Sequence, residues 1–290
     1  MALLTKPLHQ KFGKIVEDVN LDDVDTNYLY PEIRELFEKH SALLFTGQSF
    51  SEDTHIKFAK LFGPLENREA MAAKSDIEFE IPKVSNEDKD GTVFDEFDLK
   101  TLDLKGNMLW HTDSTFLPIP ALANIIAAKV IPSSGGQTEL ASTRVALKDL
   151  PKEMYKKIEG RKIWHSVAHS RAKIDKDLTQ LEKISRWEPQ RWNSIFTNPV
   201  TGEASIYIAS HSYEIEGYDK EVSLKLIETI INFCTQEKYV YSHTWKKGDV
   251  LIWDERSTLH RGRPWPYSEP RTLNSICVSV TEKDGLLKMT

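Results

Sequence analysis

Cysteine is scarce in this sequence and long apolar runs are absent, and each shortage excludes a class of protein. Only Cys234 and Cys277 occur among 290 residues, too few for a disulfide framework and typical of a reducing cytoplasm. The most apolar stretch, residues 121–132, is interrupted by an asparagine and a lysine, whereas a bilayer span needs ~20 apolar residues. Residues 1–6 lack the basic start of a signal peptide. We therefore expect a cytoplasmic protein that does not enter membranes.

An excess of positive charge is also missing. Lys and Arg number 38 against 44 Asp and Glu, which gives a formal charge of −6 at pH 7. Nucleic-acid binding requires a clustered basic surface, so nucleic acid is not expected as a partner. With 40% hydrophobic and 28% charged residues, the composition is typical of a folded globular protein.

Helical patterns are confined to a few segments. Residues 30–41 and 51–62 each place apolar side chains on one helical face, and the run 42–45 between them indicates a buried strand. Further helices are predicted over residues 143–159 and 220–236. The last helix could pack against the rest of the chain or against a second subunit, so a homo-oligomer stays open.

Short β-like runs make up most of the remaining sequence. Turn signals such as residues 133–136 and 246–249 separate them, and many short strands joined by turns predict a sandwich or barrel, of which the jelly roll is one form. The acidic stretch 66–106 is predicted to form loops and edge strands. The predicted strands are residues 123–130, 138–141, 162–167, 206–208, 239–245, 249–253 and 273–280.

A charged stretch without clear periodicity covers residues 170–193 and includes Trp187 and Trp192. Two interpretations stay open. It is either a solvated surface insertion or a lid over a binding site, because long functional loops often close over sites.

A His-x-Asp pair, His111 and Asp113, is the first candidate for chemistry. Alternate residues of a strand point to one face, so the imidazole and the carboxylate would lie side by side as metal ligands. His260, which follows a strand-like run and a turn, supplies a third candidate ligand. Two histidines and one carboxylate are the set with which non-haem Fe(II) oxygenases hold a cosubstrate and O₂.

Arg271 follows the last candidate ligand by eleven residues. A planar guanidinium suits bidentate capture of a carboxylate, and an arginine inside a barrel is costly without an anionic partner. Taken alone, Arg271 could equally belong to a structural salt bridge.

Four motifs stand at or near these residues: Trp110-His111-Thr112-Asp113-Ser114, Gly135-Gly136-Gln137-Thr138-Glu139, Gly248-Asp249-Val250-Leu251-Ile252-Trp253-Asp254-Glu255-Arg256 and Leu259-His260-Arg261-Gly262. Together they resemble the taurine / 2,4-dichlorophenoxyacetate dioxygenase family over residues 12–278, nearest to its phenoxyalkanoate herbicide-degrading branch. The resemblance implies a mainly β, double-stranded β-helix (jelly roll) core with flanking helices, in a single domain of residues 1–290.

The resemblance also implies a chemistry and a set of site residues. It assigns His111, Asp113 and His260 to Fe(II), and Arg271 with Thr138 to the distal carboxylate of 2-oxoglutarate. O₂ is the oxidant, and a small organic substrate is hydroxylated while succinate and CO₂ form. Where the attacked carbon bears an ether oxygen or another heteroatom, that bond is cleaved. Residues expected at the substrate pocket are Asn107, Trp110, Ser114, Phe116 and Ser275.

Two positions depart from the family pattern. Relatives that take sulfonates or aryloxyalkanoates typically carry a second arginine four residues after the cosubstrate arginine, but Ser275 stands there. A neutral hydroxyl cannot replace those charge-assisted hydrogen bonds. Either the substrate lacks the anion, or another base holds it; the charged stretch offers Arg171, Arg186 and Arg191. The second departure is Glu255, where relatives commonly carry an amide.

Two other functions remain open on the residues alone. A metal-dependent hydrolase could use the same three ligands with Zn²⁺ and an activated water. A non-catalytic sensor of jelly-roll type could hold a structural metal there. An arginine beside the metal would distinguish a dioxygenase from such a sensor, because a module without an anionic cosubstrate has little use for a guanidinium there.

Overall fold

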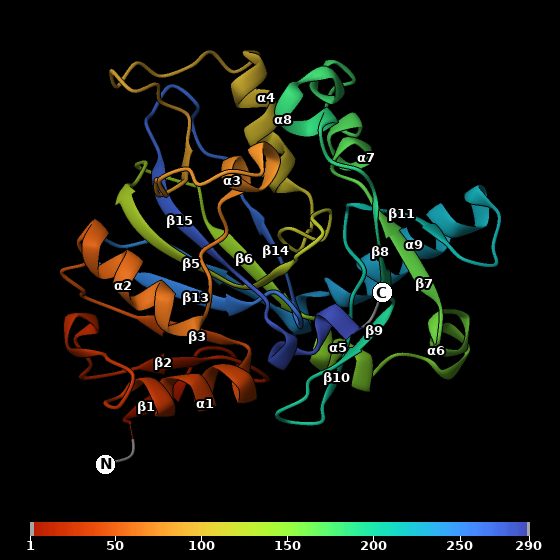
Figure 1. The fold of residues 1–290 in the computed structure, drawn as a ribbon, viewed down its shortest axis with the longest axis horizontal. Helices are drawn as coiled ribbons and strands as arrows, with labels where there is room; N and C mark the ends of the chain where they lie inside the picture. The colour runs from red at the N-terminus through yellow and green to blue at the C-terminus, as the bar shows by residue number, and fades with distance from the viewer. Residues whose placement is uncertain (1–2, 289–290) are drawn as a thin grey trace.

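Two facing sheets form the centre of the molecule, which is a computed structural model that describes residues 3–288 (Figure 1). The large sheet has seven strands in the order β1-β2-β3-β13-β5-β15-β4, and the small one has three in the order β12-β6-β14. Strands β11-β7-β8 and β9-β10 form two further sheets. This arrangement confirms the predicted jelly-roll core with flanking helices.

The elements have the following bounds. The strands are β1 (Thr5–Pro7), β2 (Lys14–Val16), β3 (Ala42–Phe45), β4 (Lys83–Ser85), β5 (Ala121–Val130), β6 (Thr138–Ser142), β7 (Lys162–His165), β8 (Gln190–Asn193), β9 (Ile195–Thr197), β10 (Ala204–Ile206), β11 (Ser212–Ile215), β12 (Val240–His243), β13 (Val250–Asp254), β14 (Thr258–Gly262) and β15 (Thr272–Ser279). The α-helices are α1 (Tyr30–His40), α2 (Glu52–Phe62), α3 (Arg68–Ala73), α4 (Leu99–Lys105), α5 (Thr143–Lys148), α6 (Lys152–Ile158), α7 (Val167–Ala172), α8 (Glu182–Ser185) and α9 (Lys220–Cys234).

The N-terminal unit agrees with the prediction. Helix α1, strand β3 and helix α2 fall where the apolar patterns placed them. The Ser51 side chain accepts a hydrogen bond from the Thr54 backbone N–H and so caps α2, as serine does at many helix starts.

Three predicted boundaries are wrong for local reasons. The helix predicted over residues 143–159 is broken into α5 and α6, because Pro151 has no N–H and obstructs the preceding turn. The strand predicted over 162–167 ends at β7, since Ser166 caps α7. The strand predicted over 206–208 is β10, which lies two residues earlier.

The acidic stretch 66–106 holds more helix than predicted. Besides the edge strand β4 it contains α3 and α4. Asn67 and Asp98 cap these two helices with their side chains. Such caps are a sequence signal for a helix start.

Alternation along the strands of the large sheet divides the core. Val250 and Ile252 of β13 pack with α1 and α2 on the outer face. Leu251 and Trp253 point between the sheets, where they meet Leu140 of the small sheet. The space between the sheets is therefore apolar at one end and remains open at the other, where the polar residues described below gather.

Three ion pairs join the charged stretch to the helices of the acidic stretch. Arg171 and Lys183 both bind Asp103 of α4, each at 2.7 Å. Arg186 pairs with Glu69 of α3 through both guanidinium nitrogens. Figure 1 shows α3, α4 and α8 together at the top of the view. The charged stretch and the helices α3 and α4 are therefore joined to one another on this side of the molecule.

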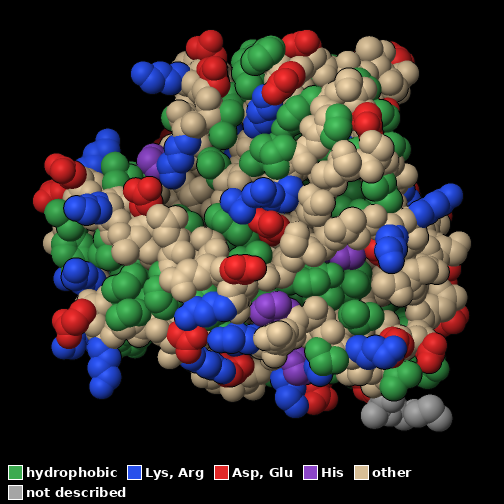
Figure 2. Space-filling view, turned by 180° about the vertical axis from the view of Figure 1, so that it is seen from behind, with side chains coloured by type: hydrophobic (Ala, Val, Ile, Leu, Met, Phe, Trp, Pro, Cys, Tyr) green, Lys and Arg blue, Asp and Glu red, His purple; other side chains and the backbone are tan. Residues whose placement is uncertain are grey.

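In the described residues, every helix is too short or too polar to cross a lipid bilayer. Basic and acidic side chains are interspersed on the face drawn in Figure 2. Helix α9 turns its apolar residues Leu226, Ile227 and Ile230 into a core shared with strands of its own chain. Neither cysteine is in a disulfide.

Candidate active site

A backbone bridge brings the two histidines together. The His111 N–H donates to the His260 carbonyl at 2.9 Å, and the His260 N–H donates to the His111 carbonyl at 2.8 Å. Their ring centroids lie 4.0 Å apart. The expectation that His111 and Asp113 share a regular strand is wrong: the bridge is isolated, and a turn that contains Asp113 and Ser114 follows it. The turn, rather than strand alternation, directs the carboxylate toward the histidines.

Three potential metal ligands converge at this point. His111 Nε2 lies 3.6 Å from one carboxylate oxygen of Asp113, and His260 Nε2 lies 3.6 Å from the other. One ligand atom from each residue falls within 4.8 Å of the others. His111 Nδ1 lies 2.7 Å from the Leu109 carbonyl. If it donates there, Nε2 keeps its lone pair for a metal.

The charge states fit a cation site. Burial lowers the pKa of His111, and it lowers the pKa of His260 to about 3, so both rings are neutral at pH 7. Burial would raise the pKa of Asp113, but His260, His111 and Arg68 together bring it well below its usual value. Two neutral imidazoles and one carboxylate are the ligand set expected for Fe(II).

Hydrogen bonds with Asn124 and Glu255 fix the position of Asp113. The Asn124 amide donates to Asp113 Oδ2 at 2.7 Å, and Glu255 Oε2 accepts from the Asp113 backbone N–H at 2.8 Å. The same Glu255 oxygen is 3.7 Å from His260 Nδ1. Its other oxygen accepts from the Trp253 indole at 2.6 Å. Glu255 therefore binds the backbone of Asp113 and lies beside the ring of His260, so it contacts two of the three candidate metal ligands.

Substitution of Glu255 tests whether it positions the ligands. Burial and the nearby Asp113 raise the pKa of Glu255 well above its usual value. This shift favours the neutral carboxyl, and glutamine is a neutral side chain of the same shape. We expect Glu255→Gln to bind Fe(II) nearly as well as the unchanged protein, and Glu255→Leu to bind it ~10–100-fold more weakly. Anaerobic Fe(II) titration against a competing chelator measures both. An equal loss in the two variants would contradict the positioning role.

Arg271 is a buried cation without an acidic partner among the described residues. Its Nε and Nη2 donate to the Gly136 carbonyl at 3.2 and 2.9 Å, and its guanidinium lies 4.9 Å from the centre of the Trp265 ring. Burial lowers the pKa of Arg271 to about 10. A Cβ at Gly136 would approach Arg271 Nε to 2.9 Å, and φ there is +67°. The glycine is required for this close approach.

Thr138 and Arg271 line the same cavity as the triad, which has a volume of about 1500 Å³. The Thr138 hydroxyl accepts a hydrogen bond from the Trp245 indole at 3.1 Å, so its own proton is available to a ligand. A hydroxyl donor and a guanidinium without an acidic partner, both facing one cavity, suit a carboxylate.

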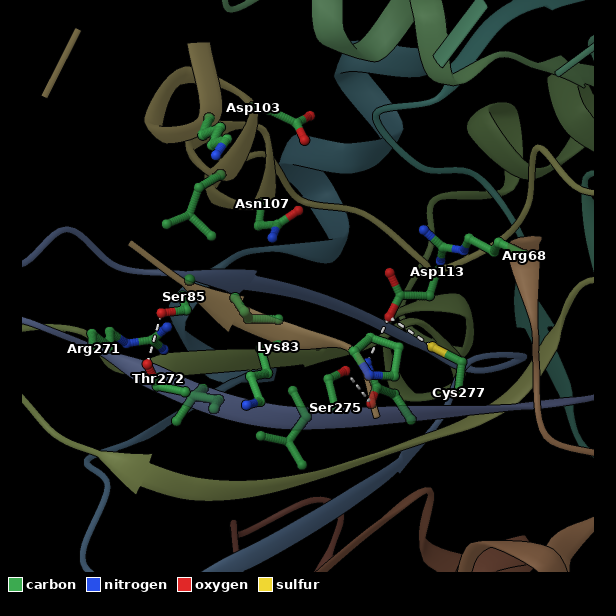
Figure 3. Close-up of a pocket in the computed structure, with 18 of the residues that line it drawn as sticks. Arg68, Lys83, Ser85, Asp103, Asn107, Asp113, Arg271, Thr272, Ser275 and Cys277 are labelled. Carbon is green, nitrogen blue, oxygen red and sulfur yellow. Dashed lines mark hydrogen bonds between the residues drawn. The ribbon is translucent and has the colours of Figure 1, made fainter. Parts of the chain in front are cut away.

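The residues predicted for the substrate pocket divide into two groups. Asn107, Phe116 and Ser275 line the cavity, and Figure 3 shows Asn107 and Ser275 in it. Trp110 and Ser114 are not among its lining residues. Trp110 packs against the apolar cluster that contains Ile227 and Ile230 of α9, under the Arg261 guanidinium. Ser114 is fully buried in the turn that contains Asp113.

The aromatic residues of the charged stretch do not line the cavity either. Trp192 is buried and donates to the Thr115 carbonyl, and Trp187 packs on a small cluster around Leu117. Of the candidate bases in that stretch, only Arg171 reaches the cavity.

Sequence reasoning missed several cavity residues close to the triad, among them Arg68, Cys277 and His211. Arg68 lies beside Asp113, Cys277 Sγ is 3.6 Å from Asp113 Oδ2, and the His211 ring packs edge-on at 6.1 Å from that of His111. Cys277 had a findable signal, since it lies six residues after Arg271 on an inward-facing row of the same predicted strand. Arg68 and His211 lie outside the predicted strands and had none.

Comparison with known proteins places this site in a family. The family model described as "Taurine catabolism dioxygenase TauD, TfdA family" matches residues 4–277. The chain belongs to the TauD/TfdA family. It is 32% identical to the α-ketoglutarate-dependent 2,4-dichlorophenoxyacetate dioxygenase of Cupriavidus pinatubonensis, over 94% of this chain and 96% of that protein. It is 31% identical to the (S)-phenoxypropionate/α-ketoglutarate dioxygenase of Sphingobium herbicidovorans, over 92% and 91%.

A solved TauD/TfdA-like structure agrees in fold. AAD-2 in complex with Mn(II) and N-oxalylglycine superposes with a TM-score of 0.90 at 29% identity, covering 97% of this chain and 99% of that one. The present chain is accordingly an α-ketoglutarate-dependent dioxygenase, an oxidoreductase that uses Fe(II), 2-oxoglutarate and O₂ on a small-molecule substrate. The family and class predicted from the motifs are confirmed.

Proposed function

We propose that His111, Asp113 and His260 hold the Fe(II) of this dioxygenase, and that Arg271 and Thr138 bind the distal carboxylate of 2-oxoglutarate. The observation that carries the proposal is the buried Arg271, which lacks an acidic partner among residues 3–288 and shares a cavity with the triad. A buried cation is costly unless an anion joins it. A dicarboxylate cosubstrate supplies that anion.

With O₂, bound Fe(II) and 2-oxoglutarate would supply an oxidant that hydroxylates a substrate C–H bond; one oxygen atom of O₂ would enter the product and the other would enter succinate as CO₂ is released. The chain's own residues position the reactants. Asn124 and Glu255 hold Asp113 in place, and Arg271 fixes one end of the cosubstrate. Holding reactants in a defined geometry is a large part of enzymatic rate acceleration.

The substrate class is a small organic molecule with a heteroatom next to the attacked carbon. The relatives named above act on 2,4-dichlorophenoxyacetate and (S)-phenoxypropionate, and Phe116 and Met108 give this cavity an apolar side for a similar body. Hydroxylation beside an ether oxygen gives a hemiacetal, which collapses and cleaves the bond. Phenoxyalkanoate-like ethers are therefore the first compounds to test.

The two alternative functions are not favoured. A zinc hydrolase and a jelly-roll sensor would each need the triad, but neither has a use for Arg271 and Thr138 beside it. Membership of the TauD/TfdA family points the same way.

The arrangement of the whole chain is part of the proposal. We regard residues 1–290 as one dioxygenase domain. We regard residues 170–193 as its lid, because their ion pairs attach them to Asp103 and Glu69, which line the cavity. The two free cysteines favour a cytoplasmic location.

A substrate screen tests the proposed function. We expect succinate formation from Fe(II), 2-oxoglutarate and O₂ to rise at least about tenfold with a phenoxyalkanoate over the slow rate without substrate, and to stop when O₂ is removed. Succinate and the released phenol are measured together. A product that forms without 2-oxoglutarate or without O₂ would favour the hydrolase.

A further inference from the structure

Arg68 presents a second guanidinium to the cavity, close to Asp113 and apart from Arg271 (Figure 3). Arg68 is the first residue of α3, and its side chain is 41% exposed. Its Nε donates to Glu66 Oε1 at 2.6 Å, and its Nη2 donates to the Ser114 hydroxyl at 3.1 Å. The guanidinium also lies 5.4 Å from the centre of the Phe116 ring. One edge of the group is thus anchored on buried residues of the protein.

The other edge is open. No hydrogen bond joins Arg68 Nη1 to any residue in the range 3–288, and this nitrogen is not among the buried unpaired atoms. Glu66 is 2% exposed and contacts the Nε side, so it orients the guanidinium without covering Nη1. An oriented guanidinium with a free outer edge is suited to bind a planar carboxylate.

The other arginines near the cavity are already engaged. Arg171 is held by Asp103, Arg186 by Glu69 and Arg261 by Glu139. Arg191, which pairs with Glu216, is not among the residues that line the cavity. Arg171 Nη1 has no hydrogen-bond partner among residues 3–288 but is buried, and the Arg261 guanidinium lies over the Trp110 ring. Arg68 differs from both because its guanidinium adjoins Asp113 and its free nitrogen is not buried.

Ser275 lies in the same cavity but cannot hold an anion by charge. Its hydroxyl donates to Asn124 Oδ1 at 2.9 Å, and Asn124 in turn donates to Asp113. The serine thus supports the asparagine that holds a candidate metal ligand. The charge that would bind a substrate anion has to come from elsewhere in the cavity.

We propose that Arg68 binds a carboxylate on the substrate, and that this contact selects anionic over neutral substrates; the proposal rests on the proposed function. Phe116 beneath the guanidinium would meet the apolar body of the same molecule. Because Arg68 adjoins Asp113, the carboxylate lies near the reacting centre. The attacked C–H bond is therefore expected close to the carboxylate, as on the carbon between an ether oxygen and a carboxyl group.

A matched pair of ligands tests this assignment. The probes are 2,4-dichlorophenoxyacetate and its amide, which differ in charge but hardly in size. Each is titrated anaerobically into the Fe(II)- and 2-oxoglutarate-loaded enzyme, with the visible charge-transfer band of the chelate as the readout of binding. We expect the unchanged protein to prefer the acid, and Arg68→Gln to reduce the acid-over-amide ratio by on the order of 30–100-fold. Arg68→Lys should retain part of the preference.

The control and the contrary results are specific. Arg191→Gln, which also removes one surface arginine, should leave the acid-over-amide ratio unchanged. An unaltered acid-over-amide ratio in Arg68→Gln overturns the assignment. The assignment also fails if the protein without substitutions binds the amide as tightly as the acid, or if its charge-transfer band does not respond to the acid. Failure of the chelate band itself, before any probe is added, would instead contradict the proposed function. The two failures are therefore distinguishable.

Discussion

Replacing Asp113 with Asn or Ala should abolish Fe(II)-dependent succinate formation, with a loss of on the order of 10³-fold or more. Loss of a residue that merely supports a metal ligand already costs ~10–100-fold, and Asp113 is the single carboxylate of the triad. The Asn variant keeps the shape of the side chain, so a loss shared by both variants assigns the effect to the charge. Succinate production with saturating 2-oxoglutarate measures it.

Folding of these variants is checked separately. Asp113 is surrounded by Arg68, two neutral histidines and Asn124, so its removal alters a polar cluster but leaves the apolar core intact. Asp23→Ala, at an exposed position of the N-terminal region, is the control and should retain full turnover. Turnover at the unchanged rate in either Asp113 variant would remove this residue from the site.

Replacing Arg271 with Met should raise the 2-oxoglutarate concentration needed for half-maximal turnover by roughly 10²-fold. Charge-assisted hydrogen bonds contribute about 1.5–3 kcal/mol each, and methionine can make none of them. Arg271→Lys keeps the charge but not the planar fork, so an intermediate requirement is expected. The 2-oxoglutarate concentration for half-maximal turnover is obtained for all three proteins from the dependence of the initial rate on 2-oxoglutarate.

Thermal stability gives an independent readout for Arg271. Burial lowers its pKa to about 10, below the value in an unfolded chain, so the charged side chain destabilises the fold at every pH below that range. Without ligand, Arg271→Met should therefore unfold at the same or a higher temperature than the unchanged protein. When metal is already bound, added 2-oxoglutarate should stabilise the unchanged protein further and hardly affect the variant. A large loss of stability without ligand would indicate a structural role instead.

The sequence indicated the chemistry more reliably than the local structure. His111, Asp113 and His260 were identifiable because their residue types and motifs are specific in combination, and the structure brings them together. The expected strand around His111 is nevertheless an isolated bridge and a turn. The convergence of the three side chains was predicted correctly, because the motifs identify the residues even where the path of the backbone between them differs from the expected strand.

Other features depended on contacts that no local pattern encodes. Arg68 reaches the cavity because α3 lies over the turn that contains Ser114, a tertiary relation between distant segments. Arg171 was one of three arginines considered as the group that holds a substrate anion, but Asp103 binds it, and periodicity cannot reveal such a partner. Pro151, by contrast, is a helix-breaking signal that is visible in the sequence, and it was sufficient to divide the helix predicted over residues 143–159 into two.

Anaerobic titration of the metal-free protein with Fe(II) and then 2-oxoglutarate tests the central claim most directly. If the triad chelates Fe(II) and Arg271 fixes the cosubstrate, the weak visible charge-transfer band of the chelate appears at about one equivalent of each. It then requires much more 2-oxoglutarate in Arg271→Met and is lost in Asp113→Ala. Tight Fe(II) binding without any band on addition of 2-oxoglutarate would contradict the account, because the metal would then serve a site that does not bind this cosubstrate.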